Sequence, residues 1–307
     1  MTAPFPSPTA TWHKTTYPAL SPSRPELSAA GKNVLITGGG TGIGAETARY
    51  FAAAGASRIA LLGRREKPLL DTKASINIRY PGVDVFVAPT DVTKKFDIDK
   101  AFDDFLHDQK LDVLVNCAAM LGPKERLEEV NGTEFLDGIQ RNLEGALYGA
   151  QAFLRHAAKD AVVVDVNSSA AHMDFSPLYP SYSIAKLAVF RLWDIVAYAN
   201  PNISVFHIQP GVVDTDINRQ VGGVRATGVE DDVSLPASFV LWLSSLEARF
   251  LKGKYLWANW DVDELKARST ELAATQELNI GLVGWPFGES GWKATWEEPA
   301  TGANSSK

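Results

Sequence analysis

The chain has 307 residues, of which 45% are hydrophobic, and it carries a formal net charge of −6 at pH 7. This hydrophobic content is enough for a sizeable core and excludes a disordered chain, while the acidic balance supplies no basic field for a phosphodiester backbone. The single cysteine, Cys117, excludes an intrachain disulfide and a cysteine-based metal site. We therefore expect a globular protein that binds neither nucleic acid nor metal.

The first 30 residues are rich in Pro, Ser, Thr and Ala and have no periodic apolar pattern. Residues 1–30 are therefore predicted to be an extended arm lying on the fold, or a disordered leader. A cleaved transit peptide is an alternative, because no acidic residue precedes Glu26, but arginine is scarce there too. No secretory signal pattern is present, and no apolar run approaches the roughly 20 residues that cross a bilayer. We expect a cytoplasmic protein with no membrane partner.

From residue 31 onward, short β-branched runs alternate with longer stretches of helical period, which indicates repeated βαβ units and a parallel sheet. The predicted strands are Asn33–Thr37, Arg58–Leu62, Val83–Val87, Asp112–Asn116, Ala161–Val166, Ile203–Gln209 and Lys254–Ala258. The predicted helices include Ile43–Ala54, Phe96–His107, Thr133–His156, Ser181–Tyr198, Leu235–Ser245 and Asp261–Leu278.

The chain shows no internal repeat and no linker that would separate a second domain. The fold class is therefore predicted to be α/β, a single doubly wound, Rossmann-type domain over residues 31–280 with a parallel seven-stranded sheet. Residues 281–307 form a tail with Trp285, Trp292 and Trp296, which we expect to pack on the body or on a neighbouring subunit.

A glycine-rich stretch, Thr37–Gly44, joins the first predicted strand directly to the first helix. Glycine lets the backbone turn tightly and approach phosphates, and the helix N-terminus offers free N–H groups with a partial positive charge. A flexible turn is the alternative, but the position between a buried strand and an amphipathic helix favours a site for a dinucleotide pyrophosphate.

Tyr182 and Lys186 are four residues apart, so a helix places the phenol and the ammonium on one face. A neighbouring cation favours the ionised form of a phenol, which suits proton transfer to a carbonyl oxygen. Alone, the pair could also be a core Tyr and a surface Lys. Ser169 lies thirteen residues before Tyr182, just after the fifth predicted strand, where its hydroxyl can donate to a substrate oxygen.

These motifs, in this order, resemble the short-chain dehydrogenase/reductase family, and the resemblance extends to about residue 260. Thr37-Gly38 followed after three residues by Gly42-Ile43-Gly44 resembles the family's TGxxxGIG loop, and Ser169, Tyr182 and Lys186 match its catalytic spacing. The resemblance implies an oxidoreductase with a nicotinamide cofactor. It also implies that Asn142 is the fourth catalytic residue, which anchors a proton-relay water.

The resemblance implies further cofactor contacts along the strand ends. Asp91-Val92 stands where the family contacts the adenine, and Asn116-Cys117-Ala118-Ala119 stands in place of its Asn-Asn-Ala-Gly. Ala119 departs from that pattern and puts the local backbone geometry in doubt. The implied cofactor-binding set is Gly38, Thr41, Gly42, Ile43, Gly44, Arg64, Asp91, Val92, Asn116, Ala118, Tyr182, Lys186, Pro210, Gly211, Val213 and Thr215.

The end of the second predicted strand favours NADP(H) over NAD(H). Relatives that use NAD commonly carry an acid there for the adenosine ribose, whereas this chain has Gly63 followed by Arg64 and Arg65. A guanidinium offers charge and fork geometry to a 2′-phosphate. The alternative is that both arginines are solvated loop residues.

Three loops at the strand ends should wall a substrate pocket with an apolar, partly aromatic set of side chains. They contribute Met120, Leu121, Met173, Phe175, Leu178, Tyr179, Ile217 and Val221. We therefore expect an NADP(H)-dependent reductase of a hydrophobic carbonyl compound, or of the corresponding alcohol, that forms a homodimer or homotetramer through its two long helices. The looser resemblance to fungal members suggests secondary metabolism. An NAD-dependent alcohol dehydrogenase and a non-redox binding module remain alternatives.

Overall fold

The computed structural model describes residues 3–174, 176–224 and 228–282. Within these residues, seven parallel strands form one sheet in the order β3-β2-β1-β4-β5-β6-β7. The strands are β1 Asn33–Thr37, β2 Arg58–Gly63, β3 Asp84–Pro89, β4 Leu111–Asn116, β5 Ala157–Val166, β6 Ser204–Gln209 and β7 Tyr255–Trp257. The predicted single, doubly wound α/β domain with a seven-stranded sheet is confirmed.

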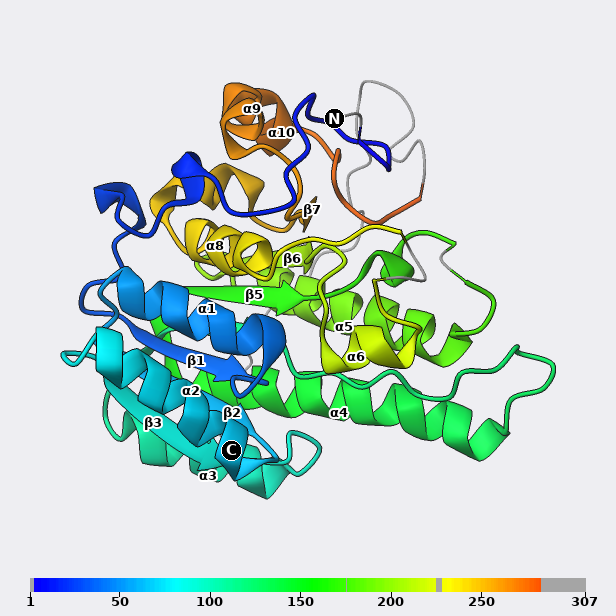
Figure 1. Ribbon diagram of the computed structural model, residues 1–307, viewed down its shortest axis with the longest axis horizontal. Coiled ribbons are helices and arrows are strands. Elements are labelled where there is room, and N and C mark those ends of the chain that lie inside the picture. Colours follow the sequence, from blue (N-terminus) through cyan, green and yellow to red (C-terminus); the bar gives the residue numbers. More distant parts are fainter. Residues whose placement is uncertain (1–2, 175, 225–227, 283–307) are drawn as a thin grey trace, which may run out of the picture.

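Helices cover both faces of the sheet (Figure 1). One face carries α1 Gly42–Ala53, α2 Glu66–Arg79 and α8 Ser234–Leu243, and the other carries α3 Lys95–Leu106, α4 Gly132–His156 and α5 Pro180–Ala199. The shorter elements are α6 Asp216–Gln220, α9 Val262–Ala267, α10 Ser269–Ala274 and the 3-10 turns η1 Pro18–Leu20, η2 Pro25–Leu27, η3 Ser169–Ala171 and η4 Leu246–Leu251.

The two faces explain why the strands are apolar at nearly every position. Val34 and Ile36 of β1 pack into one core cluster, with α1 and α8, while Leu35 between them packs into the other, with α3, α4 and α5. Successive side chains of a strand point to opposite faces, so a strand buried on both sides needs hydrophobic residues throughout.

Among the longer helical segments, two differ from the sequence-based expectation. The helix α2 was not predicted, because it carries Pro68 in its first turn and buries only Leu69, Thr72 and Ile76, too few for a clear periodic pattern. The single helix expected over Asp261–Leu278 was wrong. The chain instead forms α9 and α10 with a break at Arg268, whose guanidinium pairs with Glu271 and Glu277.

The N-terminal arm, residues 3–30, lies against the body beside the segment that follows β7. Trp12, Leu20 and Leu27 of the arm are buried, and Trp12 forms an antiparallel bridge with Trp260. The tail with Trp285, Trp292 and Trp296 lies outside the described residues, as does Phe175. Among the helices that are described, none is long and apolar enough to cross a membrane.

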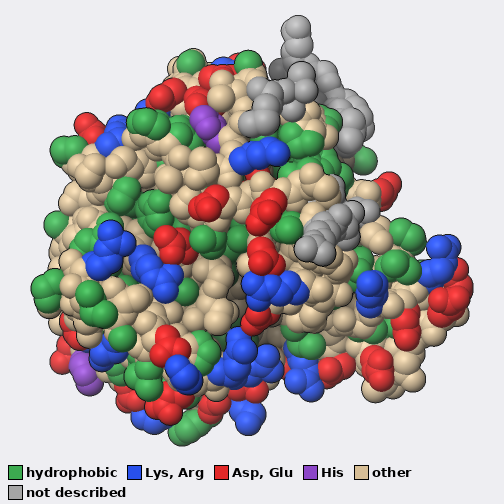
Figure 2. All heavy atoms as spheres, viewed as in Figure 1, with side chains coloured by type: hydrophobic (Ala, Val, Ile, Leu, Met, Phe, Trp, Pro, Cys, Tyr) green, Lys and Arg blue, Asp and Glu red, His purple; other side chains and the backbone are tan. Residues whose placement is uncertain are grey.

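The sheet topology determines where a ligand can bind. β1 pairs with β2 on one side and β4 on the other, so the connections diverge from β1 and leave a crevice beyond its carboxyl end. Acidic and basic side chains are interspersed on the face shown in Figure 2, with no broad patch of one sign. Because the crevice lies beyond the end of β1 and no charged surface stands out on this face, we expect the candidate site in a cavity at the carboxyl ends of the strands.

Candidate active site

A cavity of about 1140 Å³ opens at the carboxyl edge of the sheet. This volume exceeds the about 300 to 1000 Å³ of a typical pocket for one small ligand, so the cavity has room for a cofactor and a substrate together. Most of the predicted site residues line it: Gly38, Thr41, Gly42, Ile43, Arg64, Asp91, Val92, Ala118, Asn142, Ser169, Tyr182, Lys186, Pro210, Gly211, Val213 and Thr215. Gly44 and Asn116 do not line the cavity.

The glycine stretch forms a cradle that only glycine permits. Gly38 has φ +74°, and its amide donates to the carbonyl of Leu62 at 2.8 Å. A Cβ at Gly44 would overlap the carbonyl oxygen of Gly38, so the first turn of α1 packs directly on the loop. This close approach leaves the N-terminus of α1 open toward the cavity, which fits the pyrophosphate of a dinucleotide.

Thr37, at the end of β1, joins the cradle to the end of β4. Its Oγ1 accepts hydrogen bonds from the amides of Cys117 and Ala118 at 3.0 and 3.1 Å. Ala119 does not adopt a positive φ, so the alanine that replaces the family's glycine is accommodated without backbone strain. Asn116 faces away from the cavity and donates to Asp165 at 2.9 Å, which makes it a support for the strand ends.

The end of β2 is basic at the cavity rim. Arg64 and Arg65 both line the cavity, and Arg65 pairs with Asp216 of α6 at 3.0 Å. Asp91 lies nearby. Burial raises the pKa of its carboxyl, but hydrogen bonds from Thr93 and the charges of Lys94 and Arg64 outweigh burial and lower the pKa overall. The rim thus combines a cation, able to bind a phosphate, with an ionised carboxylate.

Tyr182 and Lys186 lie in the first turns of α5, which begins at Pro180 with proline in its first turn. The ammonium of Lys186 is 5.7 Å from the centroid of the Tyr182 ring, and it donates to the carbonyl of Val166 at 2.9 Å. Lys186 is only 5% exposed. A buried ammonium held beside a phenol can stabilise the negative charge that the phenol acquires when it gives up a proton.

Ser169 begins η3, immediately after β5, and lines the same cavity as Tyr182. Its amide donates to Oε1 of Gln209 on β6 at 2.6 Å, which fixes the turn to the neighbouring strand. The hydroxyl of the adjacent Ser168 accepts from the amide of Ala170 and caps that turn. Ser168 also lines the cavity, so the spacing to Tyr182 is what favours Ser169 for the role of hydrogen-bond donor to a substrate.

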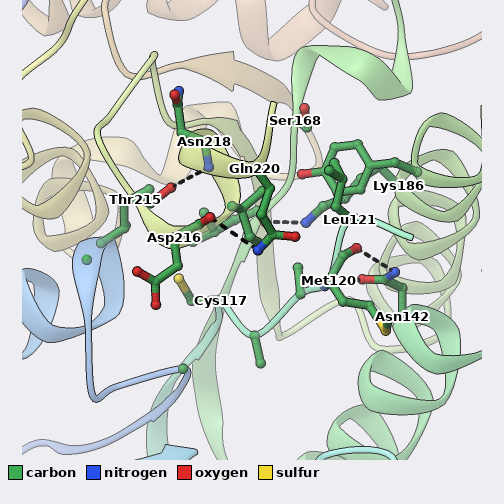
Figure 3. A pocket seen from close by; sticks show the side chains of 18 of the residues that line it. Cys117, Met120, Leu121, Asn142, Ser168, Lys186, Thr215, Asp216, Asn218 and Gln220 are labelled. Atoms are coloured by element: carbon green, nitrogen blue, oxygen red, sulfur yellow. Dashed lines mark hydrogen bonds between the residues drawn. The ribbon is translucent and has the colours of Figure 1, made fainter. Parts of the chain in front are cut away.

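Asn142 holds the loop after β4 (Figure 3). Its Oδ1 accepts from the amide of Met120 at 3.1 Å, and its Nδ2 donates to the carbonyls of Met120 and Gly138 at 2.9 and 2.8 Å. All three of these side-chain hydrogen bonds go to the backbone, so the side chain of Asn142 holds the loop after β4 against α4.

A buried polar cluster behind Lys186 was not predicted. The carboxylate of Asp165 on β5 is fully buried and bonds Asn116, Asn167 and His207 at 2.9, 2.7 and 3.1 Å. Burial raises the pKa of Asp165, but its partner His207 and the charge of Lys186 lower it overall. The only sequence signal was an acid within the apolar run Ala161–Val166. The cluster fixes the ends of β4, β5 and β6 relative to α5.

Several of the apolar side chains expected at the substrate pocket line the cavity. Met120, Leu121, Met173, Ile217 and Val221 line it as expected, whereas Leu178 and Tyr179 do not. Sequence reasoning missed the aromatic lining residues Phe5 and Trp257, which come from distant parts of the chain, and the polar Asn218 and Gln220 of α6.

Two reactive residue types near the cavity have ordinary packing roles. Burial raises the pKa of the Cys117 thiol to about 11, so it stays protonated and unreactive at neutral pH. His172 does not line the cavity. Burial lowers its pKa, and its Nε2 lies 3.2 Å from the indole N–H of Trp257, which donates to it.

Comparisons with known proteins agree with this geometry. Residues 32–224 match the family model described as short chain dehydrogenase. The chain is 35% identical over 286 residues to a "Short chain dehydrogenase/reductase" of Claviceps purpurea, covering 91% of this chain and 95% of the relative. It is 32% identical to "Short chain dehydrogenase/reductase AacuD" of Aspergillus aculeatus, covering 91% and 98%. A solved putative short chain dehydrogenase from Pseudomonas syringae superposes with a TM-score of 0.70 at 23% identity, covering 76% of this chain and 97% of that one.

Proposed function

Because the chain belongs to the short-chain dehydrogenase/reductase family, we propose that it is an NADP(H)-dependent oxidoreductase that reduces a carbonyl of a hydrophobic small molecule, or oxidises the corresponding alcohol. The observation that carries this proposal is one cavity lined at one end by the glycine cradle and Arg64, and at the other by Tyr182, Lys186 and Ser169. We place the enzyme in the cytoplasm, since a lone cysteine cannot form an intrachain disulfide, and in fungal secondary metabolism, as its fungal relatives suggest.

Carbonyl reduction adds a hydride to carbon and a proton to oxygen, and the bound nicotinamide would supply the hydride. Tyr182 gives its phenolic proton to the carbonyl oxygen, and Ser169 donates a hydrogen bond to the same oxygen as negative charge develops there. Lys186 stabilises the phenolate that remains. Asn142 keeps the loop around Met120 in place beside these groups.

The cofactor would lie along the sheet edge from Arg64 to Thr215. The cradle at Gly38–Gly44 would hold the pyrophosphate, Asp91 and Val92 the adenine, and the backbone at Pro210–Val213 the nicotinamide end. Arg64 at the rim, without an acid at Gly63, favours the 2′-phosphate of NADP(H). NAD(H) with the same catalytic residues is the second candidate.

Loss of NADPH absorbance with a panel of hydrophobic ketones and quinones tests the activity. We expect Tyr182→Phe to lower kcat by at least about a hundredfold, the usual value of a positioned acid, with cofactor affinity nearly unchanged. Lys186→Ala should lower both kcat and the affinity for the cofactor, because the ammonium of Lys186 is buried at the cavity. Tyr80→Phe, at a half-buried position just after α2 and outside the cavity lining, is the matched control. Turnover of the Tyr182 variant near the wild-type value would remove the proton-donor role, and cofactor binding without any turnover across the panel would favour a non-redox module.

A further inference from the structure

The N-terminal arm is attached to the segment after β7 by backbone and side-chain hydrogen bonds. The amide of His13 donates to the carbonyl of Asn259, and Nδ2 of Asn259 donates back to the carbonyl of His13, both at 2.8 Å. The carboxylate of Glu264 accepts from the amides of Ala10 and Thr11 at 2.6 and 2.9 Å. Figure 1 shows the arm, in dark blue, running beside α9 and α10 near β7. The arm is thus anchored at the edge of the sheet that carries the cavity.

This attachment brings an aromatic side chain from the start of the chain into the cavity wall. The rings of Phe5 and Trp257 have centroids 5.2 Å apart at an interplanar angle of 53°, and Trp12 packs edge-on against Trp257 at 5.9 Å. Phe5 and Trp257 line the cavity, as does Met173, whereas Trp12 is buried in the core and does not line it. Trp257 is held from a third side by its hydrogen bond to His172.

We infer that the arm is a structural wall of the substrate pocket and that Phe5 and Trp257 form a platform selecting planar aromatic carbonyl compounds. This inference rests on the proposed function for the location of the reacting carbonyl. Aromatic rings attract one another in offset or tilted geometry beyond the effect of area alone, and Met173 adds a polarizable sulfur to the lining of the same cavity. A small aliphatic ketone gains nothing from this platform, so Phe5 acts on specificity and not on chemistry.

Calorimetry on the full chain with saturating NADP+ tests the platform without turnover, using 2-acetonaphthone as the aromatic probe and cyclohexanone as the aliphatic one. We expect Phe5→Ala to weaken 2-acetonaphthone binding by about tenfold, from lost aromatic contact and area, and to change cyclohexanone binding by less than about twofold. Phe96→Ala, at an exposed phenylalanine on α3, is the matched control and should change neither.

Because Phe5→Ala could also release the arm, hydrogen exchange of the segment around Ala10 and Thr11 is followed in this variant and in Glu264→Ala, which removes an anchor but no lining atom. If Phe5→Ala weakens 2-acetonaphthone binding while the arm stays protected from hydrogen exchange, Phe5 contacts the ligand directly. If binding weakens in either variant whenever the arm loses its protection, the arm forms a wall of the pocket. Unchanged binding in Phe5→Ala, unchanged binding with a released arm, equal losses for both ketones, or no binding of 2-acetonaphthone by wild type would overturn the inference. Tight binding of that ketone without its reduction by NADPH would instead contradict the proposed function.

Discussion

Arg64 follows the last residue of β2 and lines the cavity where we propose that the adenosine binds, with Gly63 where NAD-dependent relatives carry an acid. If its guanidinium binds the 2′-phosphate through charge-assisted hydrogen bonds of roughly 1.5 to 3 kcal/mol, wild type should prefer NADPH over NADH by about ten- to a hundredfold in kcat/KM. Arg64→Ala should erase most of this preference through the KM for NADPH, because the contact is equally strong in ground and transition states.

Arg65→Ala is the matched control for that measurement, since Arg65 is next in sequence but is engaged by Asp216. Its effect on the preference should be smaller. Gly63→Asp should repel the phosphate and shift the enzyme further toward NADH. A wild type that works better with NADH, or an Arg64 variant that keeps its full NADPH preference, would contradict the assignment.

Site residues could be predicted from the sequence where their spacing along the chain is fixed, and could not be predicted where they meet only in the folded structure. Tyr182, Lys186 and Ser169 were predictable because a helix and a strand end set their separation along the chain. The bonds of Asp165 to Asn116 and His207 were not, since they join three strands that no local pattern pairs. Phe5 was missed for the same reason, because 252 residues separate it from Trp257 and only the attachment of the arm brings the two rings together.

Among the elements, the loop after β6 is fixed by one buried carboxylate. Oδ2 of Asp231 accepts from the amide of Val212 at 2.7 Å, and Oδ1 accepts from Nδ2 of Asn259 at 3.0 Å. Asn259 also binds the arm through His13, so Asp231 connects the arm to the backbone proposed to hold the nicotinamide end. Gly211 has φ +90°, and a Cβ there would meet this carboxylate.

We therefore predict that Asp231→Ala raises the KM for NADPH and lowers kcat, each by about three- to tenfold. The variant loses the hydrogen bond that holds the amide of Val212, and with it roughly 1 kcal/mol that keeps the loop in place. Steady-state kinetics at varied NADPH would measure both constants. Glu230→Ala, at the exposed neighbouring position, is the control and should leave them unchanged. Wild-type constants for the Asp231 variant would show that the loop keeps its position without this carboxylate.

The elements themselves were predicted well where their periodicity was strong. β1 was predicted with its observed bounds, and the ends of α4 and α5 were predicted within a residue or so, because each buries a clear apolar face. α2 escaped because it buries few side chains, and the short helix α6 lies in a polar loop where capping by Thr215, not periodicity, determines the structure. A helix that is weakly amphipathic, or that depends on a cap, has too few periodic apolar residues to be detected from the hydrophobic pattern of the sequence.

The carboxylate of Glu247 joins three segments of the molecule, and the arm among them is far from the other two in the sequence. The carboxylate binds Arg24 of the arm at 2.6 Å, the indole of Trp242 on α8 at 3.1 Å and Lys266 of α9 at 3.4 Å. The hydrogen bond from Arg24 lowers the pKa of Glu247, and the charge of Lys266 adds to this effect against the opposing effect of burial. We predict that Glu247→Gln lowers Tm at neutral pH by about 2 to 6 °C.

The Tm difference between wild type and Glu247→Gln should depend on pH, because the pKa of Glu247 is lowered in the folded protein. A carboxyl whose pKa is lower in the folded than in the unfolded chain stabilises the fold above the unfolded value of 4.5 and loses this contribution as the pH falls through the folded value. The Tm difference between wild type and Glu247→Gln should therefore be full above about pH 5 and shrink on further acidification. Glu26→Gln, which loses a more exposed pair with Arg24 at 3.5 Å, should change Tm little at any pH. A difference that grows in acid would contradict this account.

The two long helices α4 and α5 pack against each other, and their outer sides carry apolar residues that are open in a single chain. They are Leu136, Leu147 and Leu154 on α4, and Ile184, Leu187, Ile195 and Tyr198 on α5. Exposed apolar side chains gathered on one side of a monomer mark an interface, and a two-fold axis would bury the outer sides of these helices against their own copy. We predict a light-scattering mass of two or four times 33.3 kDa, and dissociation of Ile195→Glu at micromolar concentration. Ile78→Glu, at an 82% exposed position on α2, should leave the mass unchanged. Full activity at the mass of one chain would show that these helix faces serve another partner.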